Sequence, residues 1–150
     1  MNDVYETYDR LEDTYLEVTK KYLRIDESSV ERALLQHTGV YAFFGAVLAH
    51  AKMRMDESST DLERMEAKVR EERRAELLDA GKKATDRALD AYVRTVDVVQ
   101  EHEDNHRKCS HKYHLAKNIM NSLDHQKDML VQISANKRAE TKLIGDNYAG

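Results

Sequence analysis

The run from His102 to His106 is the one pattern in this chain that could hold a catalytic metal. Its letters, H-E-D-N-H, match H-E-x-x-H, in which two histidines bind zinc from one helix face and the glutamate acts as general base. Cys109, His111 and His114 follow and add further ligand types. The x positions are Asp and Asn, however, where a protease helix would carry apolar side chains, and no substrate-holding strand is predicted. We therefore predict ordinary helix packing here, with a structural metal as the alternative, and no protease.

No other pattern predicts catalysis. Glu103 and His106 form one E-x-x-H, the half-motif of di-iron helical bundles, but the sequence has no second such pair. Neither G-x-x-x-x-G-K-[ST] nor G-x-G-x-x-G occurs, so no phosphate-binding loop is predicted. We expect a protein that is not an enzyme and that needs no cofactor and no metal.

The composition predicts long helices. The 150 residues include no proline, no tryptophan and five glycines, and 35% of them are charged while 7% are aromatic. So few turn-forming residues leave little room for the connections of a multi-stranded sheet. The predicted fold class is therefore all-α.

Three features favour a cytoplasmic protein. The mean hydropathy is −0.77, and no apolar run approaches the length of a membrane span, so no membrane partner is predicted. The first ten residues, MNDVYETYDR, are acidic and lack the apolar core of a signal peptide. The single cysteine, Cys109, cannot form an intrachain disulfide, which fits a reducing compartment.

Apolar residues recur with heptad spacing in three segments. An N-terminal amphipathic helix is predicted over 1–24. A second pattern, from Val30 to Val69, predicts one helix over about 29–78, which ends at Ala80-Gly81 because glycine commonly follows a helix. A short helix over 86–96 and a long one over 97–140 come next, although the pattern also fits a single helix over 86–140. Residues 144–150 are predicted to form a frayed tail.

The two long helices predict an antiparallel helical hairpin over 25–143, with the short helix at its tip. Such a hairpin buries little of its own apolar surface, so we expect a homo-oligomer. The residues predicted to form the oligomer interface are Val4, Tyr8, Leu11, Tyr15, Val18, Tyr22, Leu130 and Ile133. For the N-terminal residues of this set, the alternative is packing against the rest of the same chain.

The tip of the predicted hairpin is basic, although the whole chain has a net charge of −4. Residues 81–96 contain four basic and two acidic side chains: Lys82, Lys83, Arg87 and Arg94 against Asp86 and Asp90. Such a surface can contact phosphates, and an oligomer would repeat it in every subunit. The alternative is a solvated helix connector with no binding role.

Short motifs along residues 25–140 resemble those of a known family. They are Ile25-Asp26 followed by Ser28 and Val30, then Val40-Tyr41, Lys83-Ala84-Thr85, and the closing run from Leu123 to Ile133. This pattern resembles that of the UvsY-type bacteriophage recombination mediators. The resemblance implies a small helical protein that assembles as a ring and acts in the host bacterial cytoplasm.

The resemblance also implies a function and partners. Members of this family bind single-stranded DNA and help load a RecA-type recombinase onto strands covered by single-strand-binding protein. Lys68 and Arg70 look similar to a Lys-x-Arg pair that contributes to DNA binding in the family. With the basic tip, the candidate DNA-binding residues are Lys68, Arg70, Lys82, Lys83 and Arg87. The alternative function is a helical phage virion or assembly component that acts through protein–protein contacts.

Overall fold

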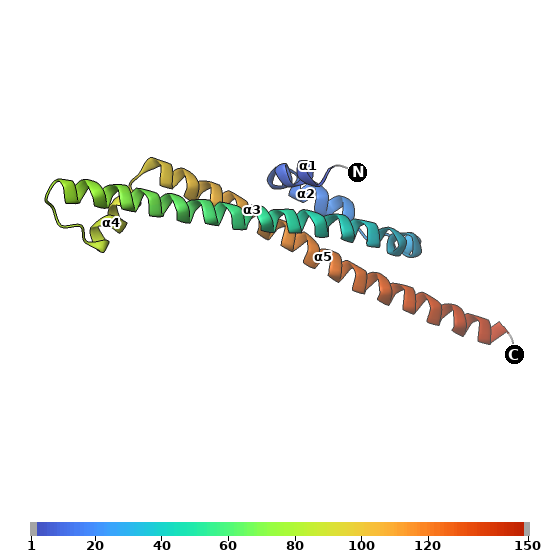
Figure 1. The fold of residues 1–150 in the computed structure, drawn as a ribbon. Coiled ribbons are helices and arrows are strands. Elements are labelled where there is room, and N and C mark those ends of the chain that lie inside the picture. Colours follow the sequence, from blue (N-terminus) through green and yellow to red (C-terminus); the bar gives the residue numbers. More distant parts are fainter. Residues whose placement is uncertain (1–2, 149–150) are drawn as a thin grey trace. The chain divides into compact units, whose positions relative to one another are not determined.

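The computed structural model describes residues 3–148, and the side chains of all of these except Glu27 and residues 145–148. Within that range the chain is helical and contains no strand, which confirms the predicted all-α class. The elements are α1 (Val4–Asp9), α2 (Leu11–Tyr22), the 3₁₀ turn η1 (Glu27–Ser29), α3 (Val30–Asp79), α4 (Asp86–Val93) and α5 (Asp97–Tyr148) (Figure 1). None of the helices in the described part of the chain has an apolar stretch long enough to cross a membrane.

The chain divides into two compact units. The terminal unit comprises Met1–His50 and His114–Gly150, and the middle unit comprises Ala51–Tyr113. Both α3 and α5 contribute one part to each unit. The terminal unit also contains α1 and α2, whereas the middle unit contains α4.

The bounds of the long helices agree with the heptad pattern at most ends. α3 is unbroken from Val30 to Asp79, close to the predicted 29–78. The segment 86–140 is two helices, because the chain leaves helical geometry after Val93: the Thr95 side chain donates to the Tyr92 carbonyl at 2.7 Å, and α5 begins at Asp97. α5 continues through residues 144–148, which were predicted to fray; residues 149–150 lie outside the described part.

The N-terminal segment differs from the single helix predicted over 1–24. It forms two helices that meet at Arg10, whose backbone angles of φ −94° and ψ 6° end α1 and begin α2. Tyr8 and Leu11, on either side of this break, are both buried. The change of direction lets both side chains pack inside the terminal unit. Residues 1–2 of the predicted helix lie outside the described part.

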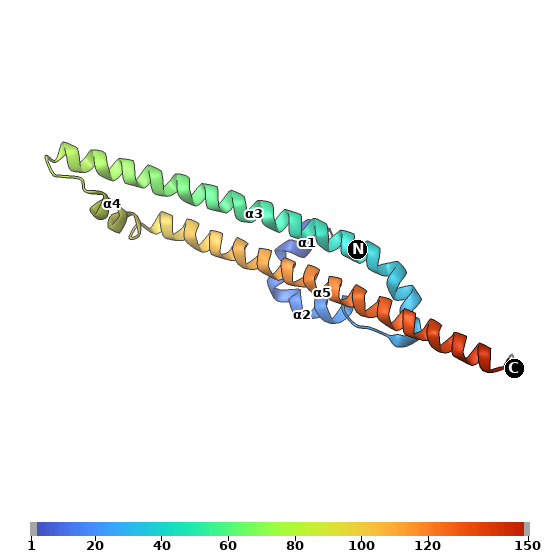
Figure 2. The same ribbon diagram turned by 90° about the horizontal axis from the view of Figure 1, so that it is seen from below.

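Aromatic contacts hold α1 and α2 against α3 in the terminal unit (Figures 1 and 2). The rings of Tyr5 and Tyr8 each meet the His50 ring edge-on, with centroids 4.8 Å apart. Tyr22 meets Phe44 in the same way at 5.5 Å. The N-terminal segment therefore packs against its own chain, which was the alternative to contact with another subunit.

Burial corrects part of the predicted oligomer interface. Tyr8, Leu11 and Leu130 are buried within the terminal unit, so they present almost no surface to a second copy. The other predicted interface residues are half-buried: Val4, Tyr15, Val18, Tyr22 and Ile133. For these five residues the oligomer interface stays a prediction.

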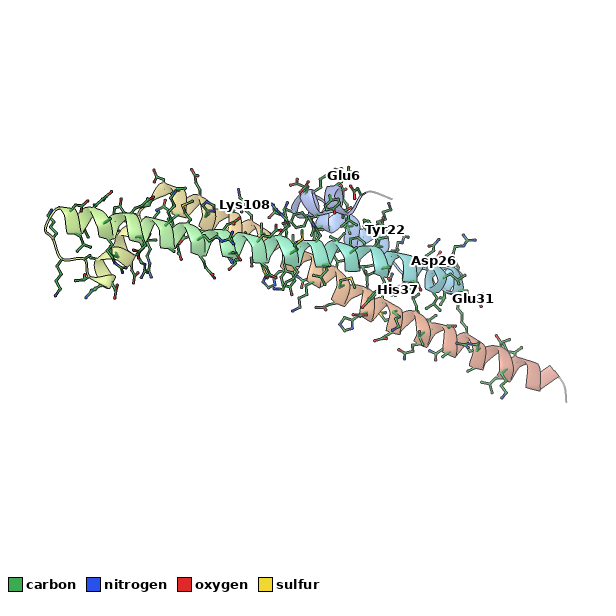
Figure 3. All side chains as sticks on the ribbon, in the orientation of Figure 1. Glu6, Tyr22, Asp26, Glu31, His37 and Lys108 are labelled. Atoms are coloured by element: carbon green, nitrogen blue, oxygen red, sulfur yellow. The ribbon has the colours of Figure 1, made fainter. Side chains whose placement is uncertain are left out.

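Polar side chains also connect the helices of the terminal unit. His37, which occupies a heptad position of α3, is buried and its Nε2 donates to the Leu123 carbonyl at 2.9 Å (Figure 3). The Gln126 amide donates to the Tyr22 carbonyl at 2.8 Å, which connects α5 to the end of α2. These two bonds satisfy polar groups that would otherwise be costly to bury.

The middle unit has a smaller core. Its buried cluster consists of Val69, Val93 and Val99, one residue from each of its three helices, with Leu62, Met65 and Val96 packed around it. Farther along the same two long helices, Ser58 of α3 lies 3.1 Å from Nδ1 of His106. In this unit α3 and α5 therefore run antiparallel, with α4 docked against both.

Candidate functional site

The candidate site is the segment 80–96, which follows α3 and contains α4. Its path is determined by the end of α3, where Gly81 has a φ of +67°, a left-handed conformation that favours glycine. The Gly81 N–H donates to the Leu78 carbonyl at 2.9 Å, and the Lys82 N–H donates to the Leu77 carbonyl at 2.8 Å. This pair of bonds is the Schellman arrangement, and it turns Lys82 and Lys83 out of the helix into solvent.

α4 is fixed at both its start and its inner face. The Thr85 hydroxyl oxygen caps the helix by accepting from the Ala88 N–H at 3.3 Å. Leu89 and Val93 are buried, so this face of the short helix is held against the rest of the middle unit. Arg87 lies on the exposed face. The same residues that dock α4 therefore direct Arg87 outward.

Basic side chains on the adjacent part of α3 are neutralised. All seven basic residues of α3 within the middle unit have a carboxylate within 4.0 Å: Lys52, Arg54, Arg64, Lys68, Arg70, Arg73 and Arg74. For five of them the carboxylate belongs to their own helix. Arg70 pairs with Asp90, and Arg74 pairs with Asp86 at 3.5 Å as well as with Glu71.

The pairing of Asp86 and Asp90 with α3 leaves the cations of the candidate site uncompensated. Asp86 and Asp90 are the two acids of α4, and both are taken by arginines of α3. In the described part of the chain, no carboxylate lies within ion-pair distance of the basic residues that come from the segment itself, namely Lys82, Lys83, Arg87 and Arg94. All four side chains are exposed. The site is thus a short basic surface next to a balanced helix.

The structure separates the five predicted DNA-binding residues into two groups. Lys82, Lys83 and Arg87 are together on the exposed segment and free of carboxylate partners within the described residues. Lys68 instead lies 3.9 Å from Glu72, and Arg70 is paired with Asp90. Arg94 was missed as a candidate. Arg94 is one of the four basic residues of 81–96, so the sequence did contain a reason to include it. The charge count set Asp86 and Asp90 against two of these four residues.

The arrangement offers long-range attraction and hydrogen-bond donors to a polyanion. Lysine and arginine side chains that neutralise phosphates release counterions, and this release drives sequence-independent binding. Tyr92 is the aromatic residue of the segment, and its ring is covered by the Arg73 guanidinium at 4.5 Å from the centroid. The chemistry of the segment is therefore that of phosphate contacts rather than base stacking.

The histidine-rich stretch of α5 has a packing role at one position. The Ser58 hydroxyl donates its hydrogen to the Met55 carbonyl at 2.8 Å, so it accepts the hydrogen bond from Nδ1 of His106. Cys109 is buried and His102 is half-buried. In the part of the chain that the structure describes, no three His, Cys, Asp or Glu side chains converge in a way that could hold a metal ion.

Comparison with known proteins gives no further assignment: no family model, no curated protein and no solved structure matches the chain. The resemblance to the UvsY-type mediators therefore depends on the short motifs alone, and function is argued from the charge distribution.

Proposed function

We propose that this chain is a non-enzymatic recombination mediator that binds single-stranded DNA through the segment 80–96 and helps load a RecA-type recombinase in the host bacterial cytoplasm. The observation that carries the DNA-binding part is the contrast in ion pairing. All seven basic residues on the neighbouring stretch of α3 have acidic partners, whereas Lys82, Lys83, Arg87 and Arg94 have none within the described residues.

The sequence motifs support the remainder of the proposal. They point to recombinase and single-strand-binding protein as partners.

We further propose that α3 and α5 form one long antiparallel hairpin and that several copies assemble, as a ring if the family resemblance holds. The contact of His37 with Leu123 in one unit and that of Ser58 with His106 in the other have the same antiparallel order along the chain. Exposed apolar side chains support assembly, among them Leu16, Leu35, Met129, Leu143 and Ile144. Assembly would repeat the basic segment and raise the affinity for a long strand.

The test is a fluorescence-anisotropy titration of a labelled, mixed-sequence single strand at about 50 mM and about 200 mM salt. The variant Lys82→Glu with Lys83→Glu should bind about tenfold or more weakly at the lower salt concentration. Its log–log salt slope should be shallower by about 1.4, since each single-strand phosphate contact contributes about 0.7. The fold should persist because both side chains are exposed.

The matched control is Lys117→Glu with Lys127→Glu, which makes the same change of charge at two exposed positions of α5. If only net charge matters, both double variants lose affinity equally and the site assignment fails. If the wild-type protein does not bind single strands at about 50 mM salt, where phosphate contacts are strongest, the mediator proposal is replaced by the virion-component alternative.

A further inference from the structure

A second basic surface lies in the terminal unit, in a groove between the start of α3 and the last part of α5. Residues 28–32 line one side, and five residues of α5 line the other: Ser134, Lys137, Arg138, Thr141 and Lys142. Figure 3 labels Asp26 and Glu31, which mark the beginning of α3 at this groove. Nothing in the sequence analysis assigned a role to this surface.

The α5 side of the groove lies where its core-facing positions change character. Ala116, Leu123 and Leu130 occupy the packed face of α5 and are buried. The same heptad continues to Ser134, Lys137 and Thr141, so the apolar face becomes one of hydroxyls and cations. Residues 134, 137, 138, 141 and 142 share one helix face by their spacing. This end of α5 therefore cannot continue the core of the unit.

The groove carries a strong positive charge. Arg32, Lys137, Arg138 and Lys142 line it, and Glu31 is the acidic residue among its lining. In the part of the chain that the structure describes, Arg32, Arg138 and Lys142 have no carboxylate within ion-pair distance. In this respect the three cations resemble those of segment 80–96.

The donors that face the groove are side chains rather than the start of α3. Asp26 accepts from the backbone N–H and the hydroxyl of Ser28, at 2.9 and 2.7 Å, and from the Ser29 hydroxyl at 3.2 Å. Arg138 donates to the Ser134 carbonyl and hydroxyl oxygens, both at 3.3 Å, which holds its guanidinium along the helix. A ligand of the groove would therefore be bound by exposed basic side chains, among them Arg32, Arg138 and Lys142.

We propose that this groove binds the phosphodiester backbone of nucleic acid. The inference rests on the proposed function, which it extends to a second contact surface. Arginine, lysine and serine are the side chains that contact phosphates and position a strand. A cluster of basic side chains can also bind an acidic peptide, and oligoglutamate is the probe for that outcome in the test below. The lining contains no aromatic ring, so base identity and base pairing should have little influence on binding.

The experiment uses the full chain with three charges neutralised, Arg32→Gln, Arg138→Gln and Lys142→Gln. Its control neutralises three exposed lysines elsewhere on α5, Lys108→Gln, Lys117→Gln and Lys127→Gln. Labelled single strands and labelled duplex of the same sequence are titrated with both variants at about 50 mM salt. The groove variant should lose about fivefold or more in affinity for both nucleic acids and about 2 units of single-strand salt slope, since each contact contributes about 0.7. The control should lose little.

Each other outcome is decisive. Equal losses in the groove variant and its control would overturn the groove assignment, while the Lys82 and Lys83 variant would still decide the proposed function. Loss in the groove variant without loss in the Lys82 and Lys83 variant would support the groove and reject segment 80–96 as the primary site. If labelled oligoglutamate binds in a groove-dependent manner and neither nucleic acid does, an acidic peptide is the ligand and this inference is wrong. Absence of any nucleic-acid binding by the wild type would reject both.

Discussion

The terminal and middle units are built from the same two long helices but are stabilised differently. Six of the eight largest fully buried side chains belong to the terminal unit: Leu11, Phe44, Val47, Ile119, Leu123 and Leu130. The middle unit contributes Leu89 and Val99. The difference comes from the third element packed on each pair of helices. α1 and α2 together cover more of the terminal unit than the eight-residue α4 covers of the middle unit.

Ion pairs are frequent in the middle unit, and most of them join residues three or four apart on one helix. Exposed pairs of this kind contribute little to stability. Their consequence is electrostatic. They balance the basic side chains of α3, so the basic side chains of segment 80–96 are the ones without a carboxylate partner nearby. The middle unit has fewer fully buried apolar side chains and carries an exposed basic segment. The terminal unit contains most of the fully buried apolar side chains.

The largest expected effect is in the terminal unit. Phe44→Ala should lower the free energy of unfolding by about 3–5 kcal/mol, because it removes a ring that is 1% exposed and contacts Tyr22 and Phe43. Urea unfolding followed by circular dichroism measures the change. Leu35→Ala, at a position 82% exposed on the same helix, should change stability by less than about 0.5 kcal/mol. Similar losses in the two variants would mean that α2 does not cover α3 as described.

The corresponding change in the middle unit is smaller. Leu89→Ala should cost about 2 kcal/mol, the low end for a buried leucine, because the thin core around α4 can partly close the cavity. Its control is Leu78→Ala, since Leu78 is 62% exposed at the end of α3. Amide hydrogen exchange should locate the loss in residues 86–93 rather than in α1 and α2. A loss as large as that of Phe44→Ala would contradict the contrast between the units.

Replacing a glycine by alanine should change stability in opposite directions in the two units. Gly81→Ala should destabilise by about 1–2 kcal/mol, because a φ of +67° is strained for any residue with a Cβ. Gly39→Ala, inside α3, should stabilise by about 0.5–1 kcal/mol, because alanine favours a helix more than glycine does. An added Cβ meets no atom within 4 Å at either site, so contacts do not obscure the comparison. Thermal unfolding of both variants gives the two signs, and equal signs would reject the helix end assigned at Gly81.

Helix positions could be predicted from this sequence because the heptad period indicates which face of a helix packs. Val30 and Val69, the first and last residues of the heptad pattern predicted for α3, are both buried, and so are His37, Phe44 and Ser58 of the same spacing. Tyr41 also has this spacing and is exposed, whereas Val47 lies outside it and is buried. Two of these buried residues, His37 and Ser58, are polar. His37 and Ser58 occupy core positions because backbone or side-chain partners from α5 satisfy them.

The features that sequence reasoning missed depend on contacts between elements. The break at Arg10 does not interrupt the apolar spacing of the N-terminal segment, and it follows from the docking of Tyr5 and Tyr8 on His50. The ion pair of Arg70 with Asp90 joins residues twenty positions apart, and it exists because Leu89 and Val93 fix the orientation of α4. A count of charges along the sequence could not determine which cations would remain unpaired.

The smallest expected effect is at Asp26, before α3 in the terminal unit. Hydrogen bonds from the Ser28 side chain and backbone, then from Ser29, favour the ionised carboxylate and lower the pKa of Asp26 from its ordinary value of 3.8. Stabilisation by this group is therefore present above pH 3.8 and is lost as the pH falls through the lower pKa of the folded state. The loss is small because the carboxylate is exposed.

Asp26→Asn provides the comparison, because asparagine can cap the same turn but does not titrate. The wild type should melt slightly higher than this variant near neutral pH, and the difference should shrink as the pH is lowered below about 4. Measuring the difference between the two proteins removes the acid destabilisation that both share. A difference at Asp26 that stays constant across this range, or that grows toward acid pH, would show that the carboxylate charge does not stabilise the start of α3.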